Sequence, residues 1–232
     1  MNPTLPFVGR RKEAAQLRRL HARDRHALIV GQDGVGKSAL VAQLRGTLPL
    51  IVCAHSETLG EICHHLETEL NSPALDWPLV QRKNRLLKIL AETGRTAVFD
   101  AVSWTTPKIS SFLESAMERA PVWLCTRSEH ARDIGHFWPL LARFERVELQ
   151  PFHAMETQKL VAAAVREKVV PEKTLEIAGW LHHRAAGSPK ILRALLAEIA
   201  RGHYDLGNPH ALRRLDLDRH IHEMFPVTPF DK

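Results

Sequence analysis

Short apolar runs alternate along this chain with longer segments in which apolar residues recur every three or four positions. Runs of four or five apolar residues are typical of strands buried on both faces, and they lie at 27–30, 50–54, 96–99 and 121–125, with a short fifth strand at 146–149. The periodic segments predict helices over 11–20, 37–45, 57–70, 79–93 and 107–120. Strands that alternate with helices predict an α/β fold, a parallel sheet flanked by helices.

The pattern changes at residue 151, after which no further strand is predicted. Three helical segments follow one another at 154–168, 172–186 and 189–202. The stretch from Asn208 contains Pro209, Pro226 and Pro229, so we expect it to be irregular. The predicted organisation is therefore an α/β domain over 1–150, a small all-helical lid subdomain over 151–208 and a C-terminal tail over 209–232.

One segment carries a specific chemical motif. Residues 31–38 match the phosphate-binding P-loop pattern G-x-x-x-x-G-K-[ST], and they stand between a predicted strand and a predicted helix, as the motif requires. Glycines let backbone N–H groups curl around phosphate oxygens, while the lysine reaches the β- and γ-phosphates and the serine hydroxyl ligates Mg²⁺. We therefore expect a nucleoside-triphosphate site formed by Gly31, Asp33, Gly34, Val35, Gly36, Lys37, Ser38 and Ala39.

A P-loop also needs a carboxylate at the end of a neighbouring strand to hold Mg²⁺ through water. Asp100, directly after the strand at 96–99, fits this role together with Ser38. Many ATPases of this type place a second acid next, to orient the attacking water, but this chain has Ala101 there. We therefore expect at most a weak ATPase that converts ATP to ADP and phosphate slowly, or a base supplied from elsewhere, with Glu129 as the first candidate.

Four further segments, placed before and after the P-loop, indicate which class of P-loop protein the chain resembles. They are Phe7-Val8-Gly9-Arg10, Cys125-Thr126-Arg127, the stretch 141–149 and Gly187-Ser188-Pro189-Lys190. Together with the P-loop and Asp100, they resemble the motifs of AAA+ ATPases and their STAND relatives, in a style similar to small ATPases of transposition regulators and replication initiators. The resemblance covers about residues 6–202 and implies ATP or ADP as the ligand.

The resemblance implies a role for each matching residue. Val8 and Gly9 would line the base pocket, and Thr126 would sense the γ-phosphate. Arg143, with Arg146 as a weaker second, would reach the nucleotide of a neighbouring subunit in an ATP-dependent homo-oligomer. In the lid, Pro189 would pack near adenine and Lys190 would contact phosphate, where the family usually has arginine with its planar fork of donors.

The charge of the chain is concentrated near its start. The net charge is +6, and residues 1–25 alone hold seven basic and two acidic side chains. Such a patch can attract the phosphates of DNA, although a solvated helix face gives the same pattern. We therefore expect a nucleotide switch that assembles on and acts with DNA. The alternatives are a STAND-type signalling or defence switch with protein partners, and a nucleotide-binding scaffold with little catalysis.

Cysteine usage and hydropathy exclude other classes. Cys53, Cys63 and Cys125 are too few and too scattered for a disulfide framework, and the cysteines and histidines at 53–65 match no standard zinc-finger spacing. No apolar run approaches the length of a membrane span, and the first residues do not resemble a secretory signal. We therefore expect a cytoplasmic protein that has no membrane association.

Overall fold

The computed structural model describes residues 5–55, 57–73, 76–202 and 204–224. Within these ranges the chain forms two compact units. One contains residues 10–33 and 37–150 and is called the α/β unit below. The other contains residues 5–9, residues 34–36 and the described part of 151–232, and is called the helical unit. The segment 5–9 thus groups with the helices that follow residue 150, rather than with the sheet that it precedes.

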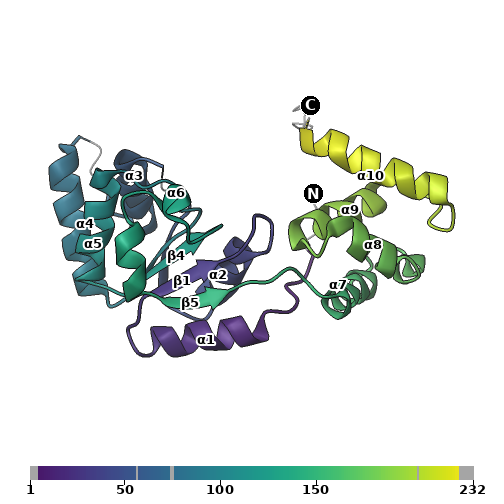
Figure 1. Cartoon of the computed structure of the whole chain (residues 1–232), viewed down its shortest axis with the longest axis horizontal. Helices are drawn as coiled ribbons and strands as arrows, with labels where there is room; N and C mark the ends of the chain where they lie inside the picture. The colour runs from purple at the N-terminus through teal and green to yellow at the C-terminus, as the bar shows by residue number, and fades with distance from the viewer. Residues whose placement is uncertain (1–4, 56, 74–75, 203, 225–232) are drawn as a thin grey trace. The chain divides into compact units, whose positions relative to one another are not determined.

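The α/β unit is built on a five-stranded parallel sheet whose order is β2-β3-β4-β1-β5 (Figure 1). The strands are β1 (Ala27–Val30), β2 (Leu50–Cys53), β3 (Thr96–Phe99), β4 (Val122–Thr126) and β5 (Glu145–Glu148). The predicted α/β class is confirmed. Val30 at the end of β1 lies opposite Thr126 at the end of β4, so these two carboxyl ends lie at one edge of the sheet.

Within the described residues, one helix precedes the first strand and six helical segments lie between the strands. They are α1 (Arg11–His21), α2 (Lys37–Arg45), α3 (Leu59–Glu69), α4 (Leu79–Thr93), α5 (Pro107–Met117), α6 (Ala131–Ile134) and the 3₁₀ segment η1 (Trp138–Arg143). Local sequence sets several of their starts. Thr58 and Glu61 form a capping box at the start of α3, and Thr106 caps α5 ahead of Pro107 at its first position.

Both faces of the central strands are covered, which explains why their sequences are continuously apolar. On one face, Leu28, Phe99 and Leu124 share a core with side chains from α3, α4 and α5. On the other face lies α1, where the His21 ring meets the Trp123 ring edge-on at 6.4 Å between centroids. Strand β5 differs because it lies at the edge of the sheet and buries only its valine. Its charged residues suit an edge strand, since they oppose pairing with another chain.

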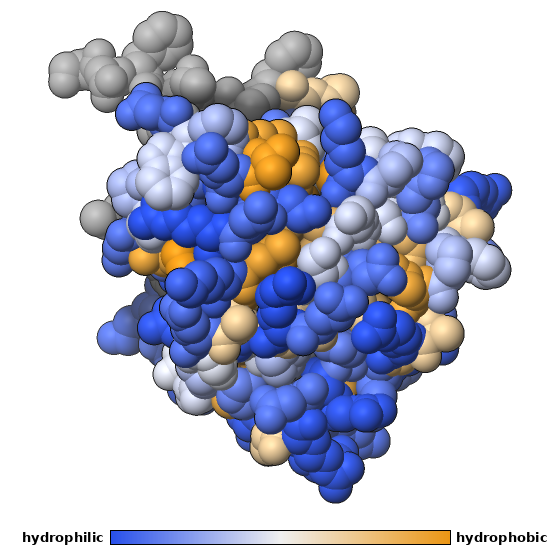
Figure 2. Space-filling model, turned by 90° about the vertical axis from the view of Figure 1, so that its left-hand side faces the viewer, coloured by the Kyte–Doolittle hydropathy of each residue, from blue (hydrophilic) through white to orange (hydrophobic). Residues whose placement is uncertain are grey.

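The outer side of the α/β unit is mainly hydrophilic. Figure 2 shows the side on which α3, α4 and α5 lie, where apolar residues appear as separate patches among hydrophilic ones. Among the described residues, Trp77, Leu79 and Val80 near the start of α4 are large apolar side chains that stay exposed. Isolated apolar residues of this kind are normal on a protein surface.

The helical unit has a core of its own. Its elements are α7 (Ala154–Arg166), the 3₁₀ segment η2 (Glu172–Leu175), α8 (Ala178–Ala185), α9 (Pro189–Arg201) and α10 (Pro209–Met224). Leu160, Leu181 and Leu195 from three of these helices pack together with Leu5, which reaches this core from the other end of the chain. This core therefore contains residues that precede the α/β unit in the sequence and residues that follow it.

Two predictions for this region are corrected by the structure. The single helix expected over 172–186 is divided into η2 and α8. The stretch from Asn208, expected to be irregular, forms the helix α10 as far as Met224. Pro209 does not interrupt this helix because it occupies the first position, where its missing N–H would have no intrahelical partner. Pro226 and Pro229, also expected in an irregular tail, lie outside the described residues.

Candidate nucleotide site

The P-loop connects the end of β1 to the start of α2. Gly34 and Gly36 have φ angles of +78° and +101°, a region that side chains beyond glycine rarely enter, which explains why glycine occupies both positions. The N–H of Gly31 donates to the carbonyl oxygen of Thr126 at 3.2 Å and so ties the start of the loop to the end of β4. Helix α2 begins at Lys37, directly after the second of these glycines.

The side chain of Lys37 is folded back onto its own loop. Its Nζ donates to the carbonyl oxygens of Gly31 at 2.6 Å and Gln32 at 3.1 Å, and lies 4.0 Å from Oδ1 of Asp33. The lysine side chain is 10% exposed, whereas that of Asp33 is 84% exposed. The ammonium group is therefore already held in the loop by neutral oxygens. Phosphate oxygens would be stronger partners, because both groups of the hydrogen bond would be charged.

The ends of β3 and β4 bring two of the predicted polar residues to the same edge of the sheet. Asp100 directly follows β3, and Thr126 ends the neighbouring strand β4. Burial raises the pKa of the Cys125 thiol, and the nearby carboxylate of Asp100, with which it is hydrogen-bonded, raises it further, while the charge of Lys37 opposes this effect. The P-loop lysine and the strand-end carboxylate therefore both lie within electrostatic reach of one buried thiol.

The hydroxyl of Thr126 has no hydrogen-bond partner within the part of the chain that the structure describes, although the residue is 1% exposed. A buried hydroxyl without a partner costs about 1–3 kcal/mol. Its position beside the start of the P-loop, at the end of the strand paired with β1, leaves it available to a ligand at this edge.

The position after Asp100 holds no acid. Ala101 is exposed, has a left-handed backbone with φ of +55°, and donates its N–H to Oδ1 of Asp100 at 2.9 Å. Glu129, the predicted alternative base, forms an ion pair with Arg146 of β5. Its carboxylate is thus already engaged by a guanidinium group.

The residues present at this edge fit a magnesium-bound nucleoside triphosphate. The loop supplies a sequestered lysine ammonium, the first turn of α2 supplies the hydroxyl of Ser38, and the strand ends supply a carboxylate and a buried hydroxyl. Val35 is buried, whereas Ala39 is exposed beside Ser38 in α2. Hydroxyl and carboxylate oxygens are ligands that Mg²⁺ prefers.

Arg143 lies near the amino ends of the strands, whereas the P-loop lies at their carboxyl ends. It ends η1 and is exposed, and Glu145, the first residue of β5, donates its N–H to the carbonyl oxygen of His26. Burial lowers the pKa of His26, and the charge of Arg143 lowers it further, so the two side chains are neighbours. Because His26 precedes β1 and Lys37 follows it, the structure does not bring Arg143 to the P-loop of its own chain.

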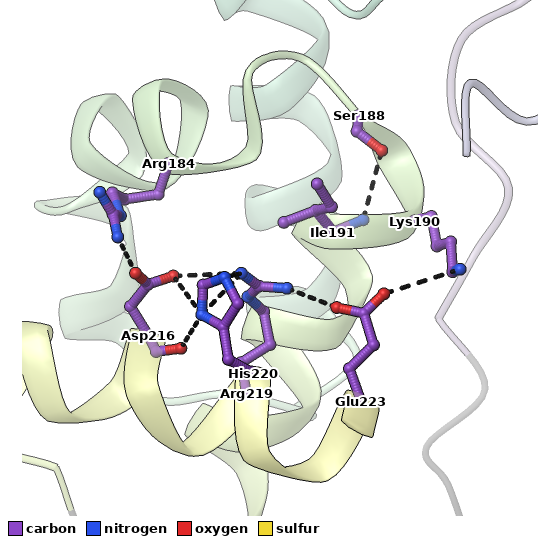
Figure 3. A network of polar contacts seen from close by, with 8 residues as sticks. All are labelled: Arg184, Ser188, Lys190, Ile191, Asp216, Arg219, His220 and Glu223. Atoms are coloured by element: carbon purple, nitrogen blue, oxygen red, sulfur yellow. Dashed lines mark hydrogen bonds and ion pairs between the residues drawn. The ribbon is translucent and has the colours of Figure 1, made fainter. Parts of the chain in front are cut away.

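Pro189 and Lys190 form the first turn of α9 in the helical unit. The hydroxyl of Ser188 accepts the N–H of Ile191, and Pro189 occupies the first helical position. The Lys190 side chain is 72% exposed, and its Nζ lies 3.7 Å from Oε1 of Glu223 on α10 (Figure 3). The second predicted phosphate-binding lysine is thus exposed and paired with a carboxylate.

That carboxylate belongs to a network of charged side chains which holds α10 against its neighbours (Figure 3). Asp216 and Arg219 are both buried and form an ion pair, at 3.4 Å. Asp216 also pairs with Arg184 of α8, and Arg219 donates to Glu223 at 2.8 Å. Nothing in the sequence indicated this network, because the charged residues of α10 take positions where a helix normally buries apolar side chains.

Val8 and Gly9 are also part of the helical unit. Val8 packs against its core, and Gly9 has a φ of +82°. One turn after Lys190 on α9, Arg193 donates to the main-chain carbonyl oxygens of Leu5 and Pro6. Sequence reasoning missed Arg193, since a contact between residues 187 and 188 positions apart leaves no local signal.

The exposed side of α1 is basic. Arg11, Lys12, Arg18 and Arg19 are all exposed, while Ala14, Leu17 and Leu20 are buried beneath them. The neutral Gln16 side chain donates to the main-chain oxygen of Arg146 and helps to fix the helix on β5. The predicted positive patch is therefore presented by a helix that is firmly seated on the sheet.

The described residues contain no group of three or more histidine, cysteine, aspartate or glutamate side chains that could hold a metal ion. None of their helices combines the length and the apolar character that are needed to cross a membrane.

The chain matches no protein-family model and no curated protein sequence. Its fold, however, is that of AAA+ P-loop ATPases, and the predicted resemblance is confirmed at this level. The ORC1 protein of Aeropyrum pernix, solved in complex with DNA, is similar with a TM-score of 0.68 and 14% identity, over 98% of this chain and 70% of that one. Cdc6p of Pyrobaculum aerophilum gives a TM-score of 0.70 and 14% identity, over 99% and 72% of the two chains.

A third similar structure belongs to the STAND class, which was the predicted alternative. It is a STAND ATPase with a tetratricopeptide-repeat sensor from Pyrococcus horikoshii, with a TM-score of 0.56 and 17% identity. The match covers 93% of this chain and 33% of that protein, so the present chain spans about a third of its length.

Proposed function

We propose that this protein is an ATP-binding switch of the AAA+ type that hydrolyses ATP slowly and acts with DNA. The observation that carries the proposal is the arrangement at one edge of the sheet, where the Lys37 ammonium is held beside the P-loop and Asp100 and Thr126 end two neighbouring strands. This combination supplies positive charge, a carboxylate and a buried hydroxyl donor, which are the groups that a bound triphosphate and its metal ion need.

In this proposal each residue has a distinct task. Lys37 leaves its loop carbonyls to contact the β- and γ-phosphates, and Thr126 donates its unpaired hydroxyl to the γ-phosphate. Ser38 and Asp100 hold Mg²⁺, which neutralises charge on the phosphates when it is bound. Val8, Gly9 and Pro189 contact the base, and Lys190 exchanges Glu223 for a phosphate oxygen.

Hydrolysis transfers the γ-phosphoryl group to water, breaks its bond to the β-phosphate oxygen and releases ADP and phosphate. The chain offers little help with the proton that the water must lose. Ala101 presents a methyl group, and Glu129 is engaged by Arg146. We therefore expect turnover below the range of about 1–10³ s⁻¹ that is usual for enzymes.

The proposed partners are DNA and further copies of this chain. The basic side of α1 supports binding to DNA phosphates, and one structural neighbour was solved with DNA. Arg143 lies at the amino end of the strands, away from its own P-loop, and in this proposal it serves the γ-phosphate of a neighbouring copy. Head-to-tail contacts of this kind generate rings or filaments.

A STAND-type signalling switch is the second candidate. The structural likeness to the Pyrococcus horikoshii protein favours it, and so does the absence of an acid after Asp100, which suits a switch that stays in its ATP-bound state. A nucleotide-binding scaffold without useful catalysis would share the site but show no phosphate release.

The central test is Lys37→Ala, with Lys88→Ala on the exposed side of α4 as the matched control. We expect the P-loop variant to lose MgATP affinity by at least about tenfold, or ~1.4 kcal/mol, in titration calorimetry, while the control binds like the wild type. Retention of wild-type affinity in Lys37→Ala would contradict the site.

Assembly is tested by sedimentation with a non-hydrolysable ATP analogue, with and without duplex DNA. We expect the wild type to form larger species, and Arg143→Ala to remain small while each copy still binds the analogue. The exposed Arg132→Ala is the matched control. A wild type that stays monomeric under every condition refutes the DNA-assembly proposal and favours the signalling switch.

A further inference from the structure

One side chain of α9 holds the main chain of the segment 5–9. On α9, the guanidinium group of Arg193 donates one hydrogen bond to the carbonyl oxygen of Leu5 at 3.0 Å and another to that of Pro6 at 2.8 Å. Both acceptors belong to the main chain of the segment 5–9. The contact therefore fixes the path of this segment, whichever side chains it carries.

The surroundings of Arg193 indicate that this contact is a structural clamp. The side chain is partly buried, and burial lowers the pKa of the guanidinium group. Guanidinium still stays charged at any physiological pH, so both hydrogen bonds are charge-assisted. A lysine could supply only a point charge in place of the planar fork that spans two successive carbonyl groups.

The other end of the segment, at Gly9, passes close to Phe152 and Glu156. A Cβ atom on Gly9 would come within 3.2 Å of Oε1 of Glu156 and 3.5 Å of the Phe152 ring. Glu156 is itself held, because its other carboxylate oxygen accepts the N–H of His153 and caps α7. Residues 5–9 are thus held by Arg193 at one end and pass close to Phe152 and Glu156 at the other.

We propose that Arg193 is a positioning residue for base recognition by this protein. It holds the segment in the path on which Val8 and Gly9 meet the base of the nucleotide, so it determines preference for adenine without touching the ligand. This inference rests on the proposed nucleotide-binding function. It adds that recognition of the base depends on Arg193, whereas recognition of the phosphates depends on Lys37.

The test compares Arg193→Met with the matched control Arg166→Met, an exposed arginine on α7. Binding is measured for MgATP, MgGTP and inorganic tripolyphosphate with magnesium. In Arg193→Met we expect ATP affinity to fall about tenfold, since hydrogen bonds to a charged group are lost, and the preference for ATP over GTP to shrink. Tripolyphosphate has no base, so its affinity should remain within about twofold of wild type.

Two further variants keep the inference falsifiable. Arg193→Lys should restore part of the ATP preference, because an ammonium group can still reach one carbonyl oxygen. Gly9→Ala should reproduce the loss of base preference from the other end, because its Cβ would displace the segment. Hydrogen exchange of residues 5–9 should rise in Arg193→Met and not in the control.

The outcomes separate this inference from the proposed function. Unchanged ATP affinity and ATP preference in Arg193→Met, with ATP binding lost in Lys37→Ala, overturns the positioning role alone. An equal loss of ATP and tripolyphosphate affinity in Arg193→Met also overturns it, since the effect is then general. If Lys37→Ala keeps its ATP affinity, the nucleotide site itself is wrong.

Discussion

The two units hold their predicted nucleotide-binding groups by different kinds of contact. In the α/β unit, Lys37 is held by the carbonyl oxygens of its own loop, five and six positions away, and Thr126 is set by strand pairing. In the helical unit, Lys190 pairs with Glu223, and the segment with Val8 is held by Arg193. The partners of the second group lie 33 to 188 positions away in sequence.

This difference has an energetic meaning. Contacts made by a tight loop and by paired strands form with the fold itself and change little with conditions. The exposed pair of Lys190 and Glu223 is worth at most about 1 kcal/mol and is weakened by salt, so a ligand can replace it easily. Lys37 and Thr126 are therefore held in fixed positions, whereas Lys190 can exchange its partner.

The largest expected effect is a loss of stability that is confined to the helical unit. Arg219→Met removes a buried guanidinium group from beside Asp216 and Glu223, which should destabilise the helical unit by about 3 kcal/mol. Hydrogen exchange should show the loss in α7–α10 and leave the sheet protected. Arg213→Met on the exposed side of α10 is the control. An equal loss of protection in both units would show that they unfold together.

A smaller effect should distinguish the two phosphate-binding lysines. Lys190→Ala should weaken MgATP binding by about threefold, or ~0.7 kcal/mol, because its ammonium is exposed and screened by solvent. This is less than the loss expected for Lys37→Ala in the same calorimetric titration. Lys159→Ala, exposed on α7, should bind like the wild type. Equal losses for Lys37→Ala and Lys190→Ala would contradict the division into fixed and exchangeable groups.

The smallest effect concerns the backbone of Ala101 in the α/β unit. Ala101→Gly relieves a left-handed alanine and should stabilise the α/β unit by about 0.5 kcal/mol in urea unfolding. Its ATP turnover should match the wild type, since no acid is lost. Ala15→Gly on the exposed side of α1 should shift stability in the opposite direction, by about 1 kcal/mol. Destabilisation by Ala101→Gly would mean that its side chain makes contacts that outweigh the strain.

The parts of the fold that sequence predicted are those whose signal is local. Each of the five strands was found, because burial on both faces requires an apolar run. Helix α10 was missed, since a proline opens it and its buried positions include Asp216 and Arg219 besides Leu215. A charged residue that is buried by pairing with another helix gives the same sequence pattern as an exposed one.

The same reasoning applies to the site. The P-loop and Asp100 follow from motif spacing and from the rule that parallel strands present their carboxyl ends at one edge, whereas Thr126 was implied by the resemblance to AAA+ ATPases. Their ligand roles stay predictions. Arg143 comes just before β5, so the same rule places it at the amino ends of the strands, away from the P-loop. Arg193 needed the folded path of residues 5–9, and no pattern near position 193 indicates it.

The grouping of residues 5–9 with the helical unit has a consequence for biosynthesis. These residues leave the ribosome before the whole α/β unit, yet Leu5 belongs to a core whose other members follow residue 150. Since domains begin to fold during synthesis, the sheet can form while this segment still has no partner. Residues 5–9 are therefore synthesised before the sheet but can pack only after it has been synthesised. The segment that we propose to recognise adenine is translated before the α/β unit and reaches its place after Arg193 has emerged.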